Sequence, residues 1–266
     1  MSSDNRAGKV VIAGAGPGDA ELITIKLQKR LAEADIIITD RLVNPEIITT
    51  HAKKNTPVIF TGKEGFNQAS FSQEQISELI IEHALHGKNV LRLKGGDVAF
   101  FSNVLDELET LIKHKIEFEI IPGITAASGV SAYAGIPLTA RNYSQGVHFI
   151  TFNPSSEILP DKWKVLAATQ DTLVFYMASK NLANLADLLL HYAAPPGRPI
   201  AIIEQATTVF QQVHVSTLQN CAADFAGKTF SSPSMVIVGD VVKLHEKFSW
   251  FDSNKNETGT IFKELK

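Results

Sequence analysis

Residues 10–19 read VVIAGAGPGD, a short run of apolar residues followed by three glycines and an aspartate. The run predicts a buried strand, and apolar residues then recur with helical spacing over residues 21–34. Glycines between a strand and a helix let the backbone come close to a ligand. This stretch therefore predicts the first strand, turn and helix of an α/β fold.

The first half of the chain continues this alternation. We expect strands over 36–39, 58–61, 89–93 and 118–121, and helices over 72–86 and 104–114. Ser72-Gln73-Glu74-Gln75 fits a capping box at the start of the first of these helices, and Gly87 would end it. Repeated strand–helix alternation predicts a mostly parallel sheet with helices on both faces.

Beyond Pro122-Gly123 the pattern changes, and we expect a second α/β domain that opens with a small-residue helix. Strand-like runs occupy 147–151, 172–176, 199–203, 212–216 and 235–238, with a helix over 182–192. The alternation is less regular here, which favours a mixed sheet. The expected domains are residues 8–123 and 124–247, followed by a polar tail over 248–266.

The composition, with 266 residues, 44% hydrophobic and 20% charged, is that of a folded globular protein. A formal net charge of −3 disfavours a nucleic-acid partner. The single cysteine, Cys221, excludes an internal disulfide and a cysteine-built metal site within one chain. Residues 1–8 lack a signal-peptide pattern, and no apolar run reaches membrane-spanning length. We therefore expect a cytoplasmic protein that uses no metal and binds no membrane.

A dinucleotide fingerprint is one interpretation of the first glycine turn. Asp40 ends the second strand about 20 residues on, where such proteins place an acid that binds ribose. However, Asp19 stands where the third glycine is required and would repel a pyrophosphate, and Pro17 has no backbone N–H. These residues favour a ligand without phosphates, and a tight turn that binds nothing is the remaining alternative.

Lys94-Gly95-Gly96-Asp97 forms a second glycine loop at the end of the fourth strand. In a parallel sheet this loop lies at the same edge as the first glycine turn, where ligands usually bind. The two loops therefore predict a shared pocket, although Gly-Gly-Asp taken alone is more often only a turn.

Several segments taken together resemble the tetrapyrrole methylase family in order and spacing. In the first half they are Gly14-Ala15-Gly16-Pro17-Gly18-Asp19, Asp40-Arg41-Leu42-Val43, Gly62-Lys63, Arg92-Leu93-Lys94-Gly95-Gly96-Asp97 and Pro122-Gly123-Ile124-Thr125-Ala126. In the second half they are Tyr133-Ala134-Gly135-Ile136-Pro137-Leu138-Thr139, Phe175-Tyr176-Met177 and Ser232-Pro233-Ser234. The resemblance implies two α/β domains that hold folded S-adenosylmethionine in the cleft between them, usually in a homodimer. This fold differs from that of the Rossmann-type methyltransferases.

Within this family, Asp40-Arg41-Leu42-Val43 and Gly62-Lys63 are most like the members that methylate uroporphyrinogen III to precorrin-2, which leads to sirohaem and cobalamin. The resemblance implies Asp40 as the proton acceptor and Lys63 as the proton donor. From the residues alone, an ordinary salt bridge between two such side chains is favoured.

The resemblance also implies which residues bind the cofactor and the substrate. The cofactor pocket would be lined by Pro17, Gly95, Gly96, Asp97, Phe100, Thr125, Ala126, Met177 and Ala206. The carboxylates of the macrocycle would be bound by Arg41, Lys63, Lys94 and Arg141, and Tyr176 would flank the cofactor or the macrocycle. The alternatives are plain packing for the small residues, a solvated surface position for each basic residue and a core position for the tyrosine.

Three departures from the family pattern fall among these residues. Val98-Ala99-Phe100-Phe101-Ser102-Asn103 replaces a common continuation that contains a proline and a Gly-Arg pair, Glu64 replaces a common arginine, and Thr151-Phe152-Asn153 replaces Thr-Gly-His. Two expected positive charges are lost. Another tetrapyrrole substrate such as a later corrin precursor, and a non-catalytic protein that binds S-adenosylmethionine or a tetrapyrrole, therefore stay open. A family member that modifies a protein or ribosomal RNA and a nicotinamide-dependent oxidoreductase are further alternatives.

Overall fold

The computed structural model describes residues 7–62, 71–154, 159–253 and 259–262, which divide into two compact units. The first unit runs to Ala126 and takes in residues 260–262, and the second runs from Ala127 to Gly259. Each unit has its own five-stranded sheet and its own hydrophobic core.

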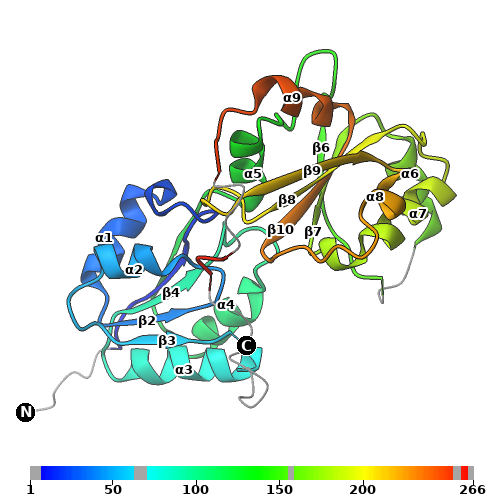
Figure 1. Ribbon diagram of the computed structural model, residues 1–266. Helices are drawn as coiled ribbons and strands as arrows, with labels where there is room; N and C mark the ends of the chain where they lie inside the picture. Colours follow the sequence, from blue (N-terminus) through cyan, green and yellow to red (C-terminus); the bar gives the residue numbers. More distant parts are fainter. Residues whose placement is uncertain (1–6, 63–70, 155–158, 254–258, 263–266) are drawn as a thin grey trace, which may run out of the picture. The chain divides into compact units, whose positions relative to one another are not determined.

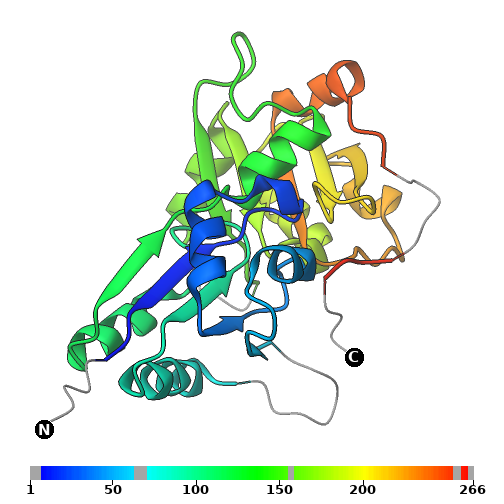
Figure 2. The same ribbon diagram turned by 90° about the vertical axis from the view of Figure 1, so that its left-hand side faces the viewer.

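All strands in the sheet of the first unit are parallel, in the order β3-β2-β4-β1-β5 (Figure 1). They are β1 (Val10–Gly14), β2 (Ile36–Thr39), β3 (Val58–Phe60), β4 (Val90–Lys94) and β5 (Phe118–Ile121). In the central pair, Val10 lies opposite Val90 and Gly14 opposite Lys94. Figure 2 shows β1 in blue with β5 in green beside it. The expected parallel sheet is confirmed.

Helices cover both faces of this sheet (Figure 1). They are η1 (Ala20–Leu22), α1 (Ile25–Glu33), α2 (Pro45–His51), α3 (Gln73–Leu85) and α4 (Val104–Lys113). Successive side chains of a strand point to opposite faces. Val11 and Ala13 of β1 therefore pack with residues of α1 and α2, whereas Val10 and Ile12 pack with residues of α3 and α4.

The helix expected over 21–34 is interrupted in the structure. The Asp19 side chain accepts a hydrogen bond from the backbone N–H of Glu21 (2.8 Å) and caps the 3-10 turn η1. The Thr24 side chain accepts one from Leu27 (3.1 Å) and caps α1. Short polar side chains that bond nearby backbone groups favour a helix start over a helix interior, so two caps divide the segment.

Two other helix starts have clear local signals. The apolar pattern alone does not predict α2, but Asn44 caps it by accepting from Glu46 N (3.0 Å), and Pro45 takes its first position. At α3 the expected capping box is confirmed, because Ser72 and Gln75 each accept a hydrogen bond from the backbone N–H of the other.

The sheet of the second unit is mixed, in the order β6-β7-β10-β8-β9. Its strands are β6 (Val147–Thr151), β7 (Thr172–Tyr176), β8 (Pro199–Glu204), β9 (Gln212–Thr217) and β10 (Ser234–Val238). β6 and β7 are parallel, and β10 lies antiparallel between β7 and β8. The expectation of a mixed sheet is confirmed. β7 and β8 consequently run in the same direction and end at the same edge.

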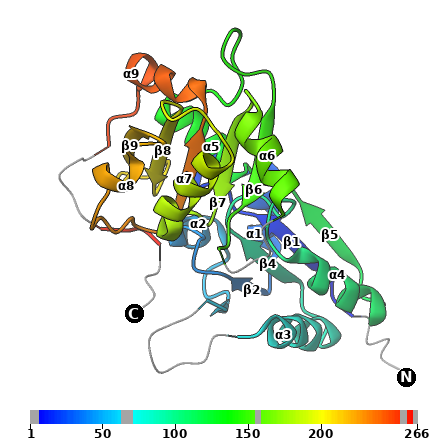
Figure 3. The same ribbon diagram turned by 90° about the vertical axis from the view of Figure 1, so that its right-hand side faces the viewer.

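The core of the second unit lies between this sheet and three of its helices, α6 (Pro160–Ala168), α7 (Leu182–His191) and α8 (Cys221–Asp224). The other helices are α5 (Ala126–Ala134), η2 (Ser179–Asn181), η3 (Asp240–Leu244) and α9 (His245–Phe248). Trp163 of α6, Leu185 of α7 and Cys221 of α8 share one core with Phe175 of β7, and Figure 3 shows α6 and α7 next to each other. Among the described residues, none of the helices is both long and apolar enough to cross a membrane.

Part of the expected tail packs against the second unit. The rings of Trp250 and Phe251 lie 5.2 and 4.8 Å from the ring of Tyr133, and the indole N–H of Trp250 donates to Ala132 O at 2.8 Å. Further on, the backbone oxygen of Gly259 accepts a hydrogen bond from Gln205 (2.9 Å). Aromatic rings within a polar segment therefore bind it to the domain.

Candidate functional site

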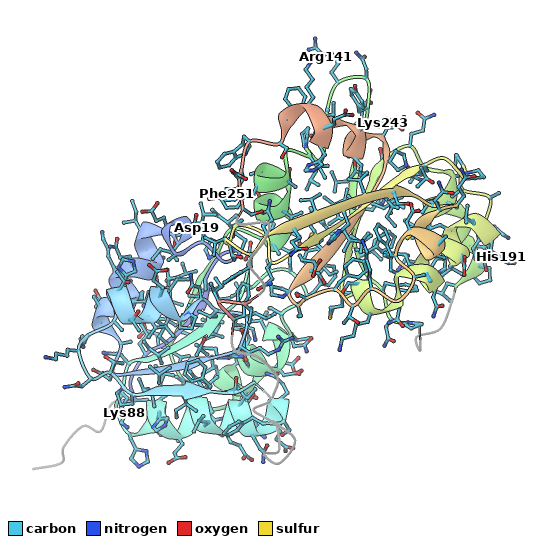
Figure 4. All side chains as sticks on the ribbon, in the orientation of Figure 1. Asp19, Lys88, Arg141, His191, Lys243 and Phe251 are labelled. Atoms are coloured by element: carbon cyan, nitrogen blue, oxygen red, sulfur yellow. The ribbon has the colours of Figure 1, made fainter. Side chains whose placement is uncertain are left out.

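The carboxyl ends of the five parallel strands meet at one edge of the first unit, which we call the first carboxyl edge. It carries residues 15–17, 40–42, 61–62, 95–97 and 122–125, each directly after a strand. Figure 4 marks the two ends of the sheet with Asp19, beyond β1 at this edge, and Lys88, just before β4 at the other. Motifs that are far apart in the sequence therefore lie together, as expected for a parallel sheet.

Glycine backbones pack against one another at this edge. Gly16 and Gly96 form an antiparallel bridge in which the two N–H groups donate to the opposite carbonyl oxygens at 3.1 and 2.8 Å. Both have positive φ, +80° and +69°, which glycine adopts without strain. A Cβ on Gly14 would lie 2.5 Å from Gly96 O, so the strand β1 and the Gly-Gly loop touch through backbone atoms. Side chains at these positions would separate the two glycine loops.

Asp40 lies where β2 leaves the sheet and contacts the second glycine loop. Its Oδ1 accepts from Leu42 N at 2.9 Å, and its Oδ2 accepts a longer hydrogen bond from Gly95 N at 3.4 Å. A Cβ on Gly95 would be only 2.8 Å from the Leu42 side chain. The structure thus brings the expected proton acceptor next to the expected cofactor loop.

Arg41 is half-buried beside Gly62, where a Cβ would lie 3.1 Å from the Cβ of Arg41. The expected proton donor, Lys63, follows directly in the chain but lies outside the described residues, as does Glu64. Arg41 therefore keeps a place at the first carboxyl edge, while the Asp40–Lys63 pair stays a prediction.

Lys94 is buried, and its ammonium group pairs with a carboxylate of α4. Its Nζ lies 3.0 Å from Glu107 Oε1 of α4, and both side chains are almost fully covered. Burial lowers the pKa of Lys94, and the neighbouring Arg92 lowers it further, whereas Glu107 and Asp40 act in the opposite direction. Lys94 therefore already has a carboxylate partner inside the protein.

The loop after the second glycine pair contributes both site and core residues. Asp97 accepts from Ala99 N at 3.0 Å, and its side chain is partly exposed next to half-buried Phe100. Val98, which replaces a proline common in the family, is buried in the core between the sheet and α3 and α4. This departure from the family pattern is thus a packing residue.

A second carboxyl edge lies in the second unit. Thr151 lies opposite Tyr176, which lies opposite Met235, and Glu204 lies opposite Ser234, so the ends of β6, β7 and β8 form one row. Tyr176, Met177 and Ala206 therefore share one edge. Met177 has φ +59° and is 64% exposed.

Sequence reasoning does not find several residues around Ala206. Gln205 and Thr207 flank it with φ values of +44° and +68°, which are uncommon for residues with a Cβ and concentrate at functional sites. Gln211 Oε1 accepts from Thr207 N at 2.9 Å. Among the described residues, Gln205 Oε1 is a buried acceptor with no hydrogen-bond partner. The residue pattern gives no signal for these positions, because their burial and positive φ are known only from the structure.

The structure does not bring Arg141 together with Tyr176 in the second unit. Arg141 is exposed in the loop before β6, and Figure 4 shows it at the end of that loop. Ser144 of the same loop accepts a hydrogen bond from Thr172 N, at the start of β7. Thr172 and Tyr176 are the two ends of β7, so about 13 Å of strand separates the end near the Arg141 loop from the end that carries Tyr176.

The arrangement at the first carboxyl edge fits an uncharged or cationic ligand better than a phosphate. A Cβ on Gly96 would meet only Ala126 N, at 3.6 Å, so the expected cofactor residues of the two loops are neighbours. Asp40 and Asp97 supply carboxylates, and Asp19 occupies the helix start. Among the described residues, no cluster of three His, Cys, Asp or Glu side chains could hold a metal ion.

A family model of the tetrapyrrole (corrin/porphyrin) methylases matches residues 9–222, which is most of the chain. The chain belongs to the tetrapyrrole methylase family. The resemblance in the sequence motifs is thereby confirmed, and the dinucleotide interpretation of the first glycine turn is set aside. This tetrapyrrole methylase has its two glycine loops where the backbones touch.

Curated relatives of this methylase include two bacterial siroheme synthases. The one from Nitrosospira multiformis is 42% identical over 252 residues, which cover 95% of this chain and 53% of the relative. The one from Saccharophagus degradans is 40% identical over 250 residues, which cover 94% and 54%. The chain therefore spans about half the length of these relatives.

Solved structures match over nearly their whole length. The native form of uroporphyrin-III C-methyltransferase from Thermus thermophilus has a TM-score of 0.74 and 30% identity, covering 89% of this chain and 100% of that one. The same enzyme was also solved with S-adenosylhomocysteine, with a TM-score of 0.74 and 28% identity, covering 89% and 94%. The expected fold, which differs from that of the Rossmann-type methyltransferases, is confirmed.

Proposed function

We propose that this methylase transfers methyl groups from S-adenosylmethionine to ring carbons of uroporphyrinogen III, giving precorrin-2 for sirohaem or cobalamin. The observation that carries the proposal is the contact of Asp40 with the Gly95 amide, at an edge where two glycine loops meet. The similarity to the Thermus thermophilus C-methyltransferase, which covers that whole chain, supports the same reaction. The siroheme synthases support the pathway, because this chain matches half of each.

Methyl transfer to a ring carbon needs the carbon to be aligned with the methyl group, followed by loss of a proton from the macrocycle. S-adenosylmethionine supplies an electrophilic methyl group when it is bound. Asp40 is our candidate for the proton acceptor, since its carboxylate is only partly buried and is held by two backbone N–H groups. Lys63 is our candidate for the proton donor.

We assign the cofactor to residues of both carboxyl edges. In the first unit they are Pro17, Gly95, Gly96, Asp97, Phe100, Thr125 and Ala126, and in the second they are Met177 and Ala206. The glycines allow backbone groups to approach the ligand, and the exposed Met177 thioether can pack softly against it. Asp97 is suited to the ammonium group of the amino-acid end.

The carboxylates on the rim of the macrocycle require basic side chains, and Arg41 is the best placed of our candidates within the first unit. Tyr176 is the candidate from the second unit, where its ring lies edge-on to Phe149 at 6.3 Å. Arg141 lies at the opposite edge of the second sheet from Tyr176, so a role in substrate binding requires another part of the substrate or another subunit.

The direct test is an anaerobic incubation of the purified protein with S-adenosylmethionine and freshly reduced uroporphyrinogen III. S-adenosylhomocysteine and the mass of the macrocycle are followed. We expect a gain of two methyl groups. No gain, with S-adenosylhomocysteine still bound, would refute this substrate and favour a later corrin precursor or a non-catalytic binding protein.

A matched pair of variants ties the activity to the site. Asp40→Asn should strongly slow product formation, whereas Asp35→Asn, at the other end of β2, should leave it unchanged. Equal activity in all three proteins would refute the role of Asp40 even if the methyl transfer itself is found.

The assembly and compartment belong to the same proposal. We infer a homodimer from the family resemblance, which light scattering of the purified protein would check. We infer a cytoplasmic setting from the use of a single cysteine, a buried thiol at Cys221. Cell fractionation would check the second inference, and recovery in a membrane or secreted fraction would contradict it.

A further inference from the structure

One loop of the first unit carries four of the nine proposed cofactor residues. It runs over residues 95–103, between β4 and α4, and contains Gly95, Gly96, Asp97 and Phe100. The residue before the loop is Lys94, and its Nζ lies 3.0 Å from the Oε1 of Glu107, in the first turn of α4. An ion pair therefore joins the two ends of the loop at its base.

Glu107 is the centre of a larger buried cluster. Its Oε1 accepts hydrogen bonds from Lys94 Nζ (3.0 Å), Arg92 Nε (3.0 Å) and Gln73 Nε2 (3.2 Å). It is 1% exposed, and Arg92 and Lys94 are 3% and 4% exposed. Its Oε2 is buried and has no hydrogen-bond partner among the described residues. One carboxylate thus connects α3, β4 and α4.

The charges of this cluster are unbalanced. Arg92 and Lys94 are two residues apart on β4 and point to the same face, so their positive charges repel each other. The negative charge of Glu107 offsets this repulsion. Removing one partner of a buried ion pair leaves an uncompensated charge and is far more disruptive than losing a surface pair. The position of Lys94 therefore depends on Glu107.

The cluster also reaches the proposed proton acceptor. Gly95 directly follows Lys94, and its N–H donates to Asp40 Oδ2 at 3.4 Å. The charge of Asp40 acts on Lys94 in the sense that favours the ammonium form. A shift of Lys94 would move the Gly95 amide away from Asp40. The base of the loop and the catalytic candidate are thus mechanically and electrostatically connected.

We propose that Glu107 is a positioning residue that, through Lys94, fixes loop 95–103 for the cofactor, so that Lys94 serves the loop and does not bind the substrate. The identity of the ligand rests on the proposed function, whereas the order of the loop does not. This assigns Lys94 a role different from the one that the sequence resemblance implies.

The test uses Glu107→Gln, Lys94→Met and the double variant, with Glu119→Gln as the matched control. Like Glu107, Glu119 pairs with more than one cation, here Lys9, Lys26 and Arg30, but it lies on β5 and away from the loop. The readouts are hydrogen exchange of the amides of residues 95–103, the Kd of S-adenosylhomocysteine by calorimetry, and the KM for uroporphyrinogen III.

In Glu107→Gln, we expect loop exchange and Kd to rise by about tenfold or more, since contacts within one buried network couple strongly. The KM for the macrocycle should stay within about twofold of the wild type. Lys94→Met keeps the Arg92–Glu107 pair and should give a smaller change in the same two readouts. Added to Glu107→Gln, it removes one uncompensated cation and should partly restore both. The control should leave the loop unchanged.

Three results would overturn the proposal. The first is a Glu107→Gln variant whose loop exchange and Kd for S-adenosylhomocysteine equal those of the wild type. The second is a double variant whose loop exchange and Kd are higher than those of Glu107→Gln alone. The third is a rise in the KM for uroporphyrinogen III in Lys94→Met with Kd unchanged, which would return Lys94 to the substrate. If Glu107→Gln does not fold, Lys94→Met decides by the same readouts. A wild type that binds no S-adenosylhomocysteine would refute the proposed function, and loop exchange would still test the cluster.

Discussion

The carbonyl oxygen of Gly96 lies 2.3 Å from the position that a Cβ on Gly123 would occupy. The same Cβ would lie 2.8 Å from the backbone of Gly14. Three glycines from β1 and from the loops after β4 and β5 therefore meet without any side chain between them. The close approach is backbone against backbone, so rotation of a side chain cannot relieve a clash.

Gly123→Ala should destabilise the protein by about 1–3 kcal/mol, because the added methyl forces the backbone of β1 or of the Gly-Gly loop to move. It should also weaken the binding of S-adenosylhomocysteine. Urea unfolding and calorimetry measure the two effects. Gly197→Ala is the control, since a Cβ there meets no atom within 4 Å. Equal stability of the two variants would contradict the packing described here.

Asp40→Asn should reduce kcat by about 10²–10⁴, the usual contribution of a positioned acid or base. The amide oxygen can still accept from Leu42 N, and only the longer hydrogen bond from Gly95 N is lost, so folding and the Kd of S-adenosylhomocysteine should change much less than kcat. Steady-state kinetics and calorimetry together separate the two effects. A loss of cofactor binding equal to the loss of kcat would show that Asp40 supports the loop and has no separate chemical role.

Glu119 should make the stability of the protein depend on pH in the acid range. Hydrogen bonds from Arg30 and then Lys26 lower the pKa of Glu119 from 4.5 to about 2. Because its folded-state pKa is lowered, its stabilising contribution is complete above the unfolded pKa and is lost as the pH falls from about 4.5 to about 2. Glu119→Gln should therefore be less stable than the wild type at neutral pH, and the difference in the free energy of unfolding should vanish near pH 2.

Urea unfolding of both proteins across this pH range measures the Glu119 effect. Asp161→Asn is the control, because the Asp161–Lys164 pair is exposed and such pairs contribute little. A stability difference for Glu119→Gln that is constant with pH would contradict the assignment.

Cys221 should be unreactive in the folded protein. Burial in the core raises the pKa of its thiol to about 11, with smaller contributions from Asp224 and Asp187. The thiolate is the reactive form, so both access and ionisation are suppressed. A colorimetric thiol reagent at mildly alkaline pH should label no cysteine in the native protein and the single cysteine after unfolding in urea. Rapid labelling of the folded chain would refute the packing of α8.

The strands and the glycine loops could be predicted from sequence because their signals are local. An apolar run rich in β-branched residues, such as residues 10–13, indicates a buried strand. Because parallel strands end at one edge, the sequence predicts that the two glycine loops lie at the same edge, but not the contact of Gly16 with Gly96. The break between η1 and α1 was missed because the apolar spacing of 21–34 is stronger than the capping signals of Asp19 and Thr24.

The roles of basic residues could not be predicted in the same way. Lys94 precedes a glycine loop and suggests a ligand contact, but its partner, Glu107, lies one loop and one helical turn further on and is recognised only in three dimensions. The conformations of Met177, Gln205 and Thr207 run against the preference of their residue types for negative φ. Tertiary contacts decide such positions, and residue patterns carry no trace of them.

The mixed sheet of the second unit has a consequence for the connections between its strands. At the first carboxyl edge, strands only leave, and each following segment must return through a helix to the far end. At the second carboxyl edge, β6, β7 and β8 end, whereas the antiparallel strands β9 and β10 begin. The connection 205–211 therefore both starts and ends at this edge. That connection can grow, shrink or mutate without rebuilding any crossover. A change in the length of the 205–211 connection should therefore disturb the sheet less than a change in a loop of the first carboxyl edge, which a helix must follow.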